Sequence, residues 1–390
     1  MKKRGEKVVA LEGSLWPSSK TRIRMKNSTL FCNFPGLVLL AFLGLLSLYF
    51  INYTLFYKGS EDRHLAYNST YPLSPPLSVP EGGTSYTIGI ITDLDTDSKN
   101  GSNSWRSFFK RGKLIQYSGG QRYKVSFDNE LTEIRSKLSY GGRGMELSEL
   151  VVFDGQLYSC DDRTGVVYRL LFGSKGITPV AWVILPDGNG DEAKGFKCEW
   201  MTVKDEHLII GGLGKEWTTS DGVVLNHNPM YIKRISANGA VEHIDWYETY
   251  ISVRKAAGIE SPGYMIHEAI EWSPIHGRWF FLPRRASMEK YDDVIDEEKG
   301  TNFLLKMKPD HYADVQVLRV GGSEKIQFPS HGFSCFKFIP GTKNRHILAL
   351  KSQEFKGSIA SYIMVLDYNG NILLPEIKIG DFKFEGVEFI

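Results

Sequence analysis

With 390 residues, the chain is long enough for one large domain or two ordinary ones. Its 47 basic and 45 acidic side chains nearly balance, and a formal net charge of +2 argues against a nucleic-acid-binding protein. Aromatic residues make up 13% of the chain and glycine occurs 39 times, which favours a β-rich protein with many tight turns.

Residues 1–34 are predicted to form a basic cytosolic tail. Up to residue 26, this region carries eight lysines and arginines but only two glutamates. Residues 35–57 follow without a charged side chain and are long enough to cross a bilayer as a transmembrane helix. Because the basic residues precede the apolar run, the positive-inside rule predicts a type II signal anchor. A cleaved signal peptide is the alternative, although no small-x-small cleavage site follows the run.

Residues 58–84 are predicted to be a lumenal stem. They are rich in Pro and Ser and show no apolar period, which is typical of an extended linker. Glycosylation sequons lie on the lumenal side at Asn68 and Asn100, whereas the sequon at Asn27 falls on the cytosolic side of the predicted anchor. The remaining residues, 85–390, are predicted to form one folded domain.

Three cysteines follow the predicted anchor, at Cys160, Cys198 and Cys335. Their spacing contains neither a CxxC pair nor a zinc-binding pattern. At most one disulfide can form among three residues; buried free thiols are the favoured prediction, and one disulfide is the alternative left open.

The folded domain contains a repeated strand start. Five segments begin with Ser or Glu, and the residues two and four positions further on are apolar or aromatic. In the first four segments, a turn and a returning apolar strand follow. The starts recur at intervals of roughly 50 to 70 residues, as expected for propeller blades built from several short strands. They are Ser148, Glu199, Glu268, Ser334 and Glu385.

These repeats predict an all-β fold, a five-bladed β-propeller. The last segment ends after its first strand, so the apolar strand in residues 85–96 is expected to complete that blade and close the ring. An irregular β-sandwich with unrelated hairpins is the alternative.

The repeat starts also predict a central calcium site. The innermost strands of a propeller line its channel, so side chains at one equivalent position converge on the axis. Glutamates gathered there would repel one another unless a cation neutralised them. Oxygen ligands without His or Cys favour a hard cation, and calcium tolerates a loose ligand geometry. The predicted ligands are Ser148, Glu149, Glu199, Glu268, Ser334 and Glu385.

Loops that follow the second strands supply candidate substrate-binding residues. Four are cations suited to phosphate oxygens, and one is an aromatic side chain on which a base can stack. They are Arg163, Lys215, Arg284, Arg285 and Trp217. The strand in residues 85–96 ends in alternating aspartates, and among these Asp95 is the candidate for positioning or deprotonating an attacking water.

Long strings of this sequence resemble the calcium-activated nucleotidase (apyrase) family. They include "GRGMELSELVVFDGQLYSCDDRTGVVYRL", "KGFKCEWMTVKDEHLIIGGLGKEWTT" and "PGYMIHEAIEWSPIHGRWFFLPRRAS". The anchor and stem resemble the membrane-bound vertebrate-type members. The resemblance implies a five-bladed propeller with calcium at the six positions named above, and it marks Arg284 as catalytically important. Cys198 and Cys335 depart from the family pattern, and strand alternation predicts that both point away from the axis.

On this resemblance, the expected activity is calcium-dependent hydrolysis of nucleoside diphosphates, with UDP and GDP preferred, and of some triphosphates. Such an enzyme would clear the nucleotide by-product of glycosyltransferases in the ER or Golgi lumen, with release of a soluble form left open. Expected partners are nucleotides and the membrane. The oligomeric state is undecided, and a homodimer is the candidate for it. No nucleic acid is expected. The alternative is a non-catalytic, calcium-stabilised receptor or adhesion propeller.

Overall fold

The computed structural model describes residues 20–25, 28–61, 66–80 and 82–390. The chain divides into two compact units, Met1–Ala66 and Tyr67–Ile390, and each is described by itself. Asn27 and residues 1–19 of the predicted basic tail lie outside the described residues.

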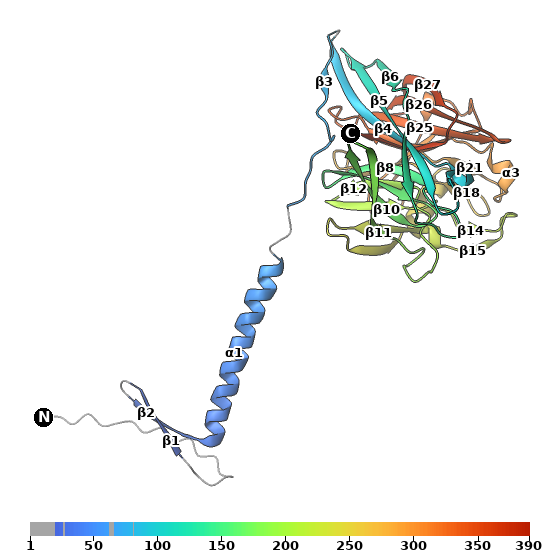
Figure 1. Ribbon diagram of the computed structural model, residues 1–390. Coiled ribbons are helices and arrows are strands. Elements are labelled where there is room, and N and C mark those ends of the chain that lie inside the picture. The colour runs from blue at the N-terminus through green and yellow to red at the C-terminus, as the bar shows by residue number, and fades with distance from the viewer. Residues whose placement is uncertain (1–19, 26–27, 62–65, 81) are drawn as a thin grey trace. The chain divides into compact units, whose positions relative to one another are not determined.

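The first unit contains a hairpin and a long helix. β1 (Lys20–Met25) and β2 (Ser28–Asn33) pair in antiparallel orientation. The helix α1 (Phe34–Glu61) follows directly and includes residues 35–57 (Figure 1). Within the described residues, we find no helix with the combined length and apolar character that crossing a membrane requires.

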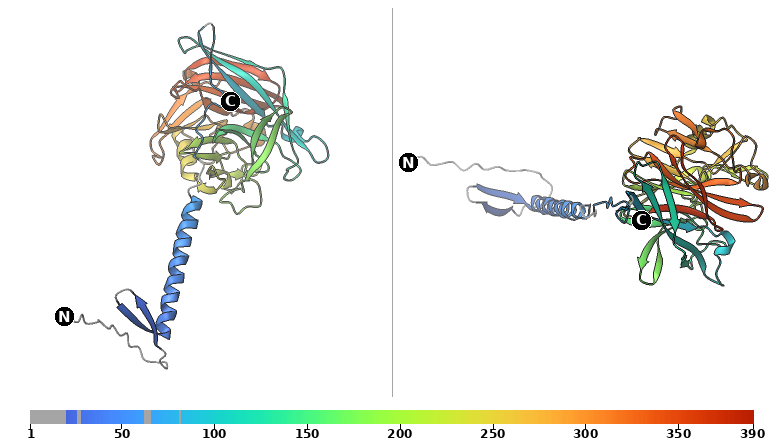
Figure 2. Two further views of the ribbon diagram at one scale, coloured as in Figure 1. Left: turned by 60° about the vertical axis from the view of Figure 1, so that its left-hand side comes forward. Right: turned by 90° about the horizontal axis from the view of Figure 1, so that it is seen from above.

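The second unit is a propeller of five antiparallel blades, which confirms the predicted all-β fold (Figures 1 and 2). Blade 1 contains β8 (Leu147–Phe153), β9 (Gln156–Asp161), β10 (Val166–Gly173) and β11 (Gly176–Ile184). Blade 2 contains β12 (Trp200–Lys204), β13 (His207–Gly211), β16 (Tyr231–Ile235) and β17 (Val241–Asp245). Blade 3 contains β19 (Ile270–Ser273), β20 (Arg278–Phe281), β22 (Phe303–Met307) and β23 (Val315–Arg319).

Blade 4 contains β24 (His331–Phe338), β25 (His346–Phe355), β26 (Ser358–Asp367) and β27 (Ile372–Gly380). Blade 5 contains β28 (Phe384–Phe389), β4 (Gly83–Thr92), β5 (Trp105–Tyr117) and β6 (Tyr123–Phe127), with β3 (Leu77–Ser78) and β7 (Thr132–Ser136) paired at its sides. Two short elements lie between blades, β18 (Tyr264–Ile266) before blade 3 and η3 (Val320–Gly322) after it. Others lie between strands of one blade: η1 (Asp95–Ser98), β14 (Trp217–Thr218), β15 (Val224–Asn226), η2 (Asn228–Met230), β21 (Arg285–Ser287) and α3 (Asp293–Asp296).

The C-terminal strand closes the ring of blades. β28 pairs with β4 in antiparallel register, and Val387 lies opposite Ile90. The first strands of the five blades contact one another in a cycle, in the order β8, β12, β19, β24, β28 and again β8, and therefore line the axis. The predicted completion of the last blade by the strand in residues 85–96 is thereby confirmed.

Several repeat starts stand where an inner strand departs from regular pairing. The register between β8 and β9 shifts from Leu147 to Glu149, which leaves Ser148 as an extra residue. β24 and β28 show the same irregularity at Ser334 and Glu385. A bulge re-aims the side chains around it and is common next to functional sites. Simple alternation of side chains, which the sequence analysis assumed, therefore fails at these positions.

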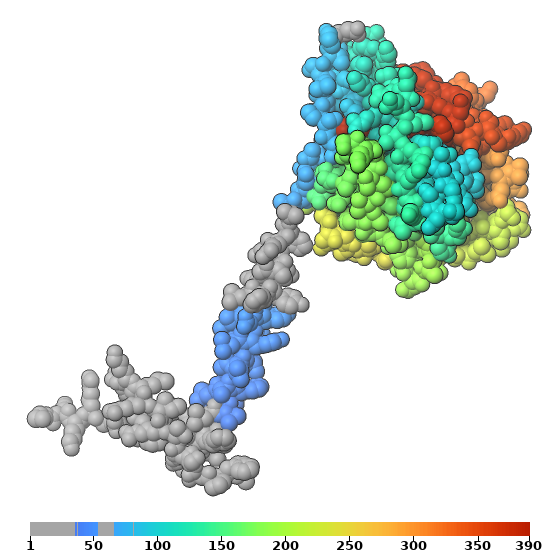
Figure 3. Space-filling view, viewed as in Figure 1, coloured from blue at the N-terminus to red at the C-terminus, as the bar shows by residue number. Residues whose placement is uncertain are grey.

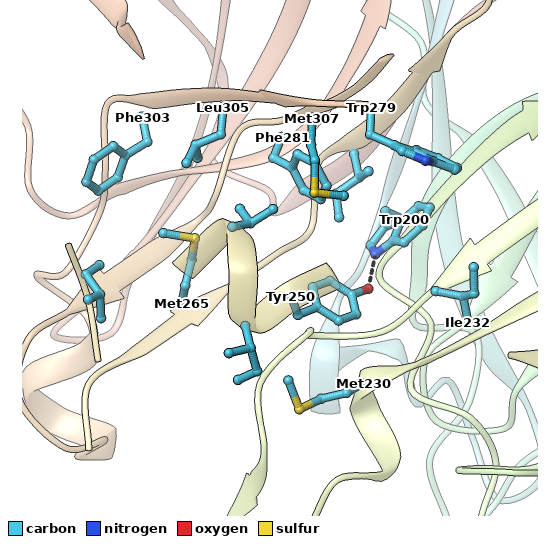
Figure 4. Close-up of a cluster of buried hydrophobic side chains, with 14 of the residues drawn as sticks. Trp200, Met230, Ile232, Tyr250, Met265, Trp279, Phe281, Phe303, Leu305 and Met307 are labelled. Atoms are coloured by element: carbon cyan, nitrogen blue, oxygen red, sulfur yellow. Dashed lines mark hydrogen bonds between the residues drawn. The ribbon is translucent and has the colours of Figure 1, made fainter. Parts of the chain in front are cut away.

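Apolar side chains fill the space between neighbouring blades. The cluster between blades 2 and 3 contains Trp200, Trp279 and Tyr250, the last from α2 (Tyr247–Ala256) (Figure 4). The Trp200 indole N–H donates to the Tyr250 hydroxyl over 3.2 Å, which satisfies both polar groups inside the cluster. Because Trp200 follows Glu199 directly, its packing fixes the backbone from which that carboxylate projects.

The segment that precedes β4 packs on the propeller surface (Figure 3). The Tyr67 ring lies 5.6 Å from the Phe153 ring, and the Asn68 backbone N–H donates to Asp154 Oδ1 over 2.7 Å. Further on, the Tyr71 hydroxyl donates to Glu388 Oε1 over 2.9 Å. The propeller unit consequently begins at Tyr67, upstream of the boundary at residue 85 predicted from composition.

A disulfide joins Cys160 to Cys198, so the prediction of free thiols is wrong for these two residues. The end of β9 in blade 1 lies beside the segment that enters blade 2, and the two Cα atoms are 6.4 Å apart, within the usual range for a disulfide. This proximity follows from blade packing, which spacing along the chain does not reveal. Cys335 is a buried free thiol, as predicted.

Replacing both Cys160 and Cys198 by alanine is expected to lower the free energy of unfolding by about 4 kcal/mol, since the bond closes a loop between residues 38 positions apart. Thermal unfolding without reductant measures the change. Cys335→Ala is the matched control, because it removes a buried thiol but no cross-link. Equal melting temperatures for the double variant and the wild type would contradict the expectation.

Candidate functional site

Most of the residues predicted for the site line one pocket of about 470 Å³. They come from the inner strands and from the loops at one end of the blades. They are Asp95, Glu199, Lys215, Trp217, Glu268, Arg284, Arg285 and Glu385. The other predicted residues, Ser148, Glu149, Arg163 and Ser334, lie outside this lining.

Arg284 holds two of the repeat-start carboxylates together. Its Nη1 donates to Glu385 Oε1 over 2.8 Å and also to Glu268 Oε2. Its Nη2 donates to Glu354 Oε2 over 2.5 Å. Arg284 is buried, with 6% of its surface exposed, so its charge is compensated by these carboxylates and not by water.

Glu199 belongs to a second ion cluster in the same pocket. Lys197 Nζ lies 2.6 Å from Glu199 Oε1 and also contacts Asp162 Oδ2. Asp162 is two residues beyond Cys160, and Glu199 directly follows Cys198. The disulfide and the lysine therefore tie the same two chain segments together at the level of the pocket.

Lys383 lies between Asp93 and Asp95, which follow β4, and the repeat-start residue Glu385. Its Nζ lies 2.8 Å from Asp93 Oδ2 and contacts Asp95 Oδ2. It also lies 3.9 Å from Glu385 Oε1. Asp95 adopts φ 47°, a conformation in which Asp is tolerated, and its backbone N–H donates to Asp93 Oδ1 over 2.8 Å. This turn directs the Asp95 carboxylate toward the pocket that it lines.

Burial dominates the electrostatics of the repeat-start glutamates. It raises the pKa of the Glu199 carboxyl to about 8, against the opposing effect of Lys197. Burial also raises the pKa of Glu268, and raises the pKa of Glu385 well above its ordinary value. Carboxylates outnumber Lys and Arg side chains in the pocket lining. A cation bound among them would stabilise the charged forms and lower these pKa values.

The repeat-start residues fit a hard cation such as calcium. Their side chains offer only oxygen atoms, the donors that calcium prefers. Ser148 Oγ is buried and has no hydrogen-bond partner within the described part of the chain. Ser334 Oγ donates to the Phe384 carbonyl over 3.2 Å, which leaves its lone pairs available. Glu199 Oε1 has the ion contact with Lys197 but no well-directed hydrogen bond.

Glu149 lies in a separate buried cluster. Its Oε1 accepts from Cys335 Sγ at 2.9 Å and lies 3.6 Å from Lys337 Nζ. Lys337 in turn pairs with Glu271 Oε1 at 2.5 Å. Because of the bulge at Ser148, the Glu149 side chain points in a different direction from the side chains that line the pocket. Cys335, predicted to point away from the axis, thus contacts Glu149, and neither residue lines the pocket.

Arg163, a candidate phosphate-binding residue, contacts two carboxylates. Its Nε donates to Glu146 Oε2 over 2.9 Å and lies 3.8 Å from Asp162 Oδ1. Glu146 forms a group with Asp93 and Asp95 in which each offers an oxygen within 4.8 Å of the others. Neighbouring basic side chains already pair with these carboxylates.

Sequence reasoning missed two lysines of the site, the partly exposed Lys197 and the buried Lys383. Lys197 and Lys383 each stand two residues before a repeat start, at Glu199 and Glu385. Both lysines precede their strands, β12 and β28, and both line the same pocket as the glutamates. A lysine two residues before a repeat-start glutamate is a sequence pattern that could have identified both lysines as site residues. Glu354, by contrast, reaches the site from β25, and no repeat marks it.

The fold and the site together define a class of protein, a five-bladed propeller whose pocket is lined by carboxylate, lysine and arginine side chains. The apyrase family model matches residues 94–390. Soluble calcium-activated nucleotidase 1 of Rattus norvegicus is 51% identical over 331 residues, which cover 85% of this chain and 80% of the relative. Apyrase apy-1 of Caenorhabditis elegans is 45% identical over 361 residues, with coverage of 92% and 98%.

A third relative, the apyrase of Cimex lectularius, is 41% identical over 327 residues, which cover 83% of this chain and 87% of the relative. This chain belongs to the apyrase family, which includes the calcium-activated nucleotidases. The resemblance drawn from the sequence is confirmed.

Proposed function

We propose that this protein is a calcium-dependent nucleoside diphosphatase that prefers UDP and GDP and also accepts some triphosphates. Its membership of the apyrase family supports nucleotide hydrolysis. The observation that carries the proposal is the pocket itself, in which oxygen ligands for a hard cation lie beside two arginines, Arg284 and Arg285.

The carboxylates of Glu199, Glu268 and Glu385 would hold the metal ion. Calcium bound there would supply positive charge against the phosphate oxygens and against the charge that develops on them during displacement. Arg284 keeps Glu268 and Glu385 close together through its bonds to both, so its role is to shape the ligand set.

Arg285 is the residue best placed to bind the phosphate chain. Its Nη1 is buried without a hydrogen-bond partner among the described residues, and its Nη2 donates to the Ser330 carbonyl over 3.3 Å. Burial and the neighbouring Arg284 lower the pKa of Arg285 to about 10, so it remains charged at neutral pH. A planar guanidinium with a free N–H can donate to a terminal phosphate oxygen.

Asp95 would orient the attacking water and accept its proton. Its Oδ1 accepts from Arg143 Nη2 at 3.2 Å, and its Oδ2 contacts Lys383. Burial and the nearby Asp93 raise the pKa of Asp95. A carboxylate with a raised pKa is a better base near neutral pH.

Replacing Arg285 by alanine is expected to lower kcat/KM for UDP by roughly 100-fold, because a charge-assisted hydrogen bond to phosphate is lost. The melting temperature is also expected to fall, because the substitution removes the Nη2 hydrogen bond to the Ser330 carbonyl and the ion contact with Asp296, so kcat/KM is measured below the unfolding transition of the variant. Arg234→Ala is the matched control, because Arg234 pairs with Glu242 at the surface. Near-normal kcat/KM in Arg285→Ala would remove this residue from phosphate binding.

The activity is tested by phosphate release from UDP with calcium, with EDTA and with magnesium alone. A panel of UDP, GDP, ADP and the corresponding triphosphates then tests the preference. Release that depends on calcium supports the proposal. A protein that calcium stabilises against heat but that releases no phosphate from any nucleotide would instead favour the receptor or adhesion propeller.

The proposed location is the ER or Golgi membrane, with the propeller in the lumen and UDP or GDP from sugar transfer as its substrate. This rests on the uncharged run of residues 35–57 and the basic residues before it. Asn68 is exposed and available for glycosylation. Glycosidase-sensitive modification is expected at Asn68 or Asn100, and modification at Asn27 would contradict the orientation. Release of a soluble form and homodimer formation belong to the same proposal and are tested by sedimentation of the secreted protein.

A further inference from the structure

One wall of the pocket is apolar and aromatic, in contrast to the charged wall that contains Glu199, Glu268 and Glu385. Leu213 and Ile266 form a small apolar cluster with Tyr264, and Trp217 and Tyr291 pack against it. Four of these five side chains, all except that of Tyr264, line the pocket. An apolar and aromatic wall beside a charged ring suits a ligand with a flat ring at one end and phosphates at the other.

Two residues from another loop fix the ring of Trp217. Its indole Nε1–H donates to Asp187 Oδ2 over 3.2 Å. Lys194 Nζ lies 3.9 Å from the centre of the indole ring and 3.4 Å from the same carboxylate oxygen. The indole is thus held at its N–H by a hydrogen bond and at its face by a cation.

Asp187 is itself rigidly placed. It is buried, with 2% of its surface exposed, and its backbone N–H donates to the Lys194 carbonyl over 2.9 Å. Pro186 and Gly195 form a bridge that closes this loop between β11 and β12. A buried carboxylate that receives an indole N–H and an ammonium group sets the orientation of both.

We propose that Asp187 and Lys194 are positioning residues that hold Trp217 as a fixed stacking surface for the nucleobase. The inference rests on the proposed function, because it assigns the base-binding part of the same pocket. Neither residue touches the phosphates in this assignment. Both act through the orientation of the indole, so they affect the binding of substrates that carry a base.

The test compares UDP with methylenediphosphonate, which has two phosphorus groups and no base. Asp187→Ala and Lys194→Met are expected to raise KM for UDP about tenfold while kcat stays within about twofold, since stacking is a binding interaction. The inhibition constant of methylenediphosphonate should not change. Lys194→Arg keeps the cation and should restore a KM near that of the wild type.

A double-variant cycle separates this role from a merely structural one. Trp217→Ala should raise KM for UDP, and adding Asp187→Ala should then have no further effect, because the role of Asp187 depends on the indole. Asp191→Ala, an exposed change in the same loop, is the control and should leave KM unchanged.

Three outcomes would overturn the positioning role: unchanged KM in Asp187→Ala and Lys194→Met, equal losses for UDP and methylenediphosphonate, or additive effects in the cycle. Each of them presupposes a wild-type protein that hydrolyses UDP. A wild type without this activity would instead refute the proposed function, and with it the nucleobase assignment.

Discussion

Glu199→Gln is expected to weaken calcium binding by at least about tenfold, or about 1.4 kcal/mol, and to reduce phosphate release from UDP at limiting calcium. The substitution keeps an oxygen at nearly the same place but removes a negative charge from the ligand set. Calcium titration of the purified protein measures the affinity. Glu206→Gln is the matched control, since Glu206 lies in the exposed turn of the same hairpin.

The same substitution should not destabilise the calcium-free protein. The folded state raises the pKa of Glu199 from its ordinary value of 4.5 to about 8, so between these pH values the folded state holds a proton that the unfolded chain has released. The free energy of unfolding therefore falls as pH rises through this window. Glutamine does not titrate, so the free energy of unfolding of the variant does not fall with pH for this reason. At pH 8 with EDTA present, the variant should be at least as stable as the wild type. Wild-type calcium affinity in Glu199→Gln would show that Glu199 is not a ligand.

Arg284→Ala is expected to lower the free energy of unfolding by about 3–5 kcal/mol in EDTA, because Glu268 and Glu385 lose the buried guanidinium that joins them. Calcium should stabilise the variant less than it stabilises the wild type, because Arg284 no longer holds Glu268 and Glu385 together as ligands. Thermal unfolding with and without EDTA measures both quantities, and the difference between the two conditions should be smaller than in the wild type.

Arg284→Lys serves as the comparison for that experiment. Lysine keeps the positive charge but has no planar fork with which to bond two carboxylates and Glu354 at once. It should therefore restore much of the stability and little of the activity. Wild-type stability and near-normal turnover in Arg284→Ala would show that the ring of carboxylates does not depend on Arg284.

Much of the fold could be predicted because its signals are local and repeated. Alternating apolar residues after each Ser or Glu start marked the inner strands, and the incomplete last unit required a strand from the beginning of the domain. Glu199, Glu268 and Glu385 could be brought together by the same reasoning, since equivalent positions in a closed ring must converge.

What the repeat could not supply is the direction of individual side chains. Because of the bulge at Ser148, Glu149 contacts Lys337 and Cys335, and no pattern of residue types in the sequence predicts this bulge. Arg284 and Arg285 are neighbours in the chain, yet Arg284 is bonded to carboxylates, whereas Nη1 of Arg285 has no hydrogen-bond partner among the residues that the structure describes. The disulfide between Cys160 and Cys198 depends on the packing of two blades, which a single sequence does not measure.

The pairing of β28 with β4 has a consequence for the biogenesis of the protein. Glu385 lies in β28, which is synthesised long after β4, the strand with which it pairs. A nascent chain can assemble blades 1 to 4 from contiguous segments but cannot close blade 5 before β28 has been synthesised. A premature stop that removes residues 384–390 would therefore delete the closing strand and a proposed calcium ligand together, so closure of the ring and completion of the pocket occur in one step.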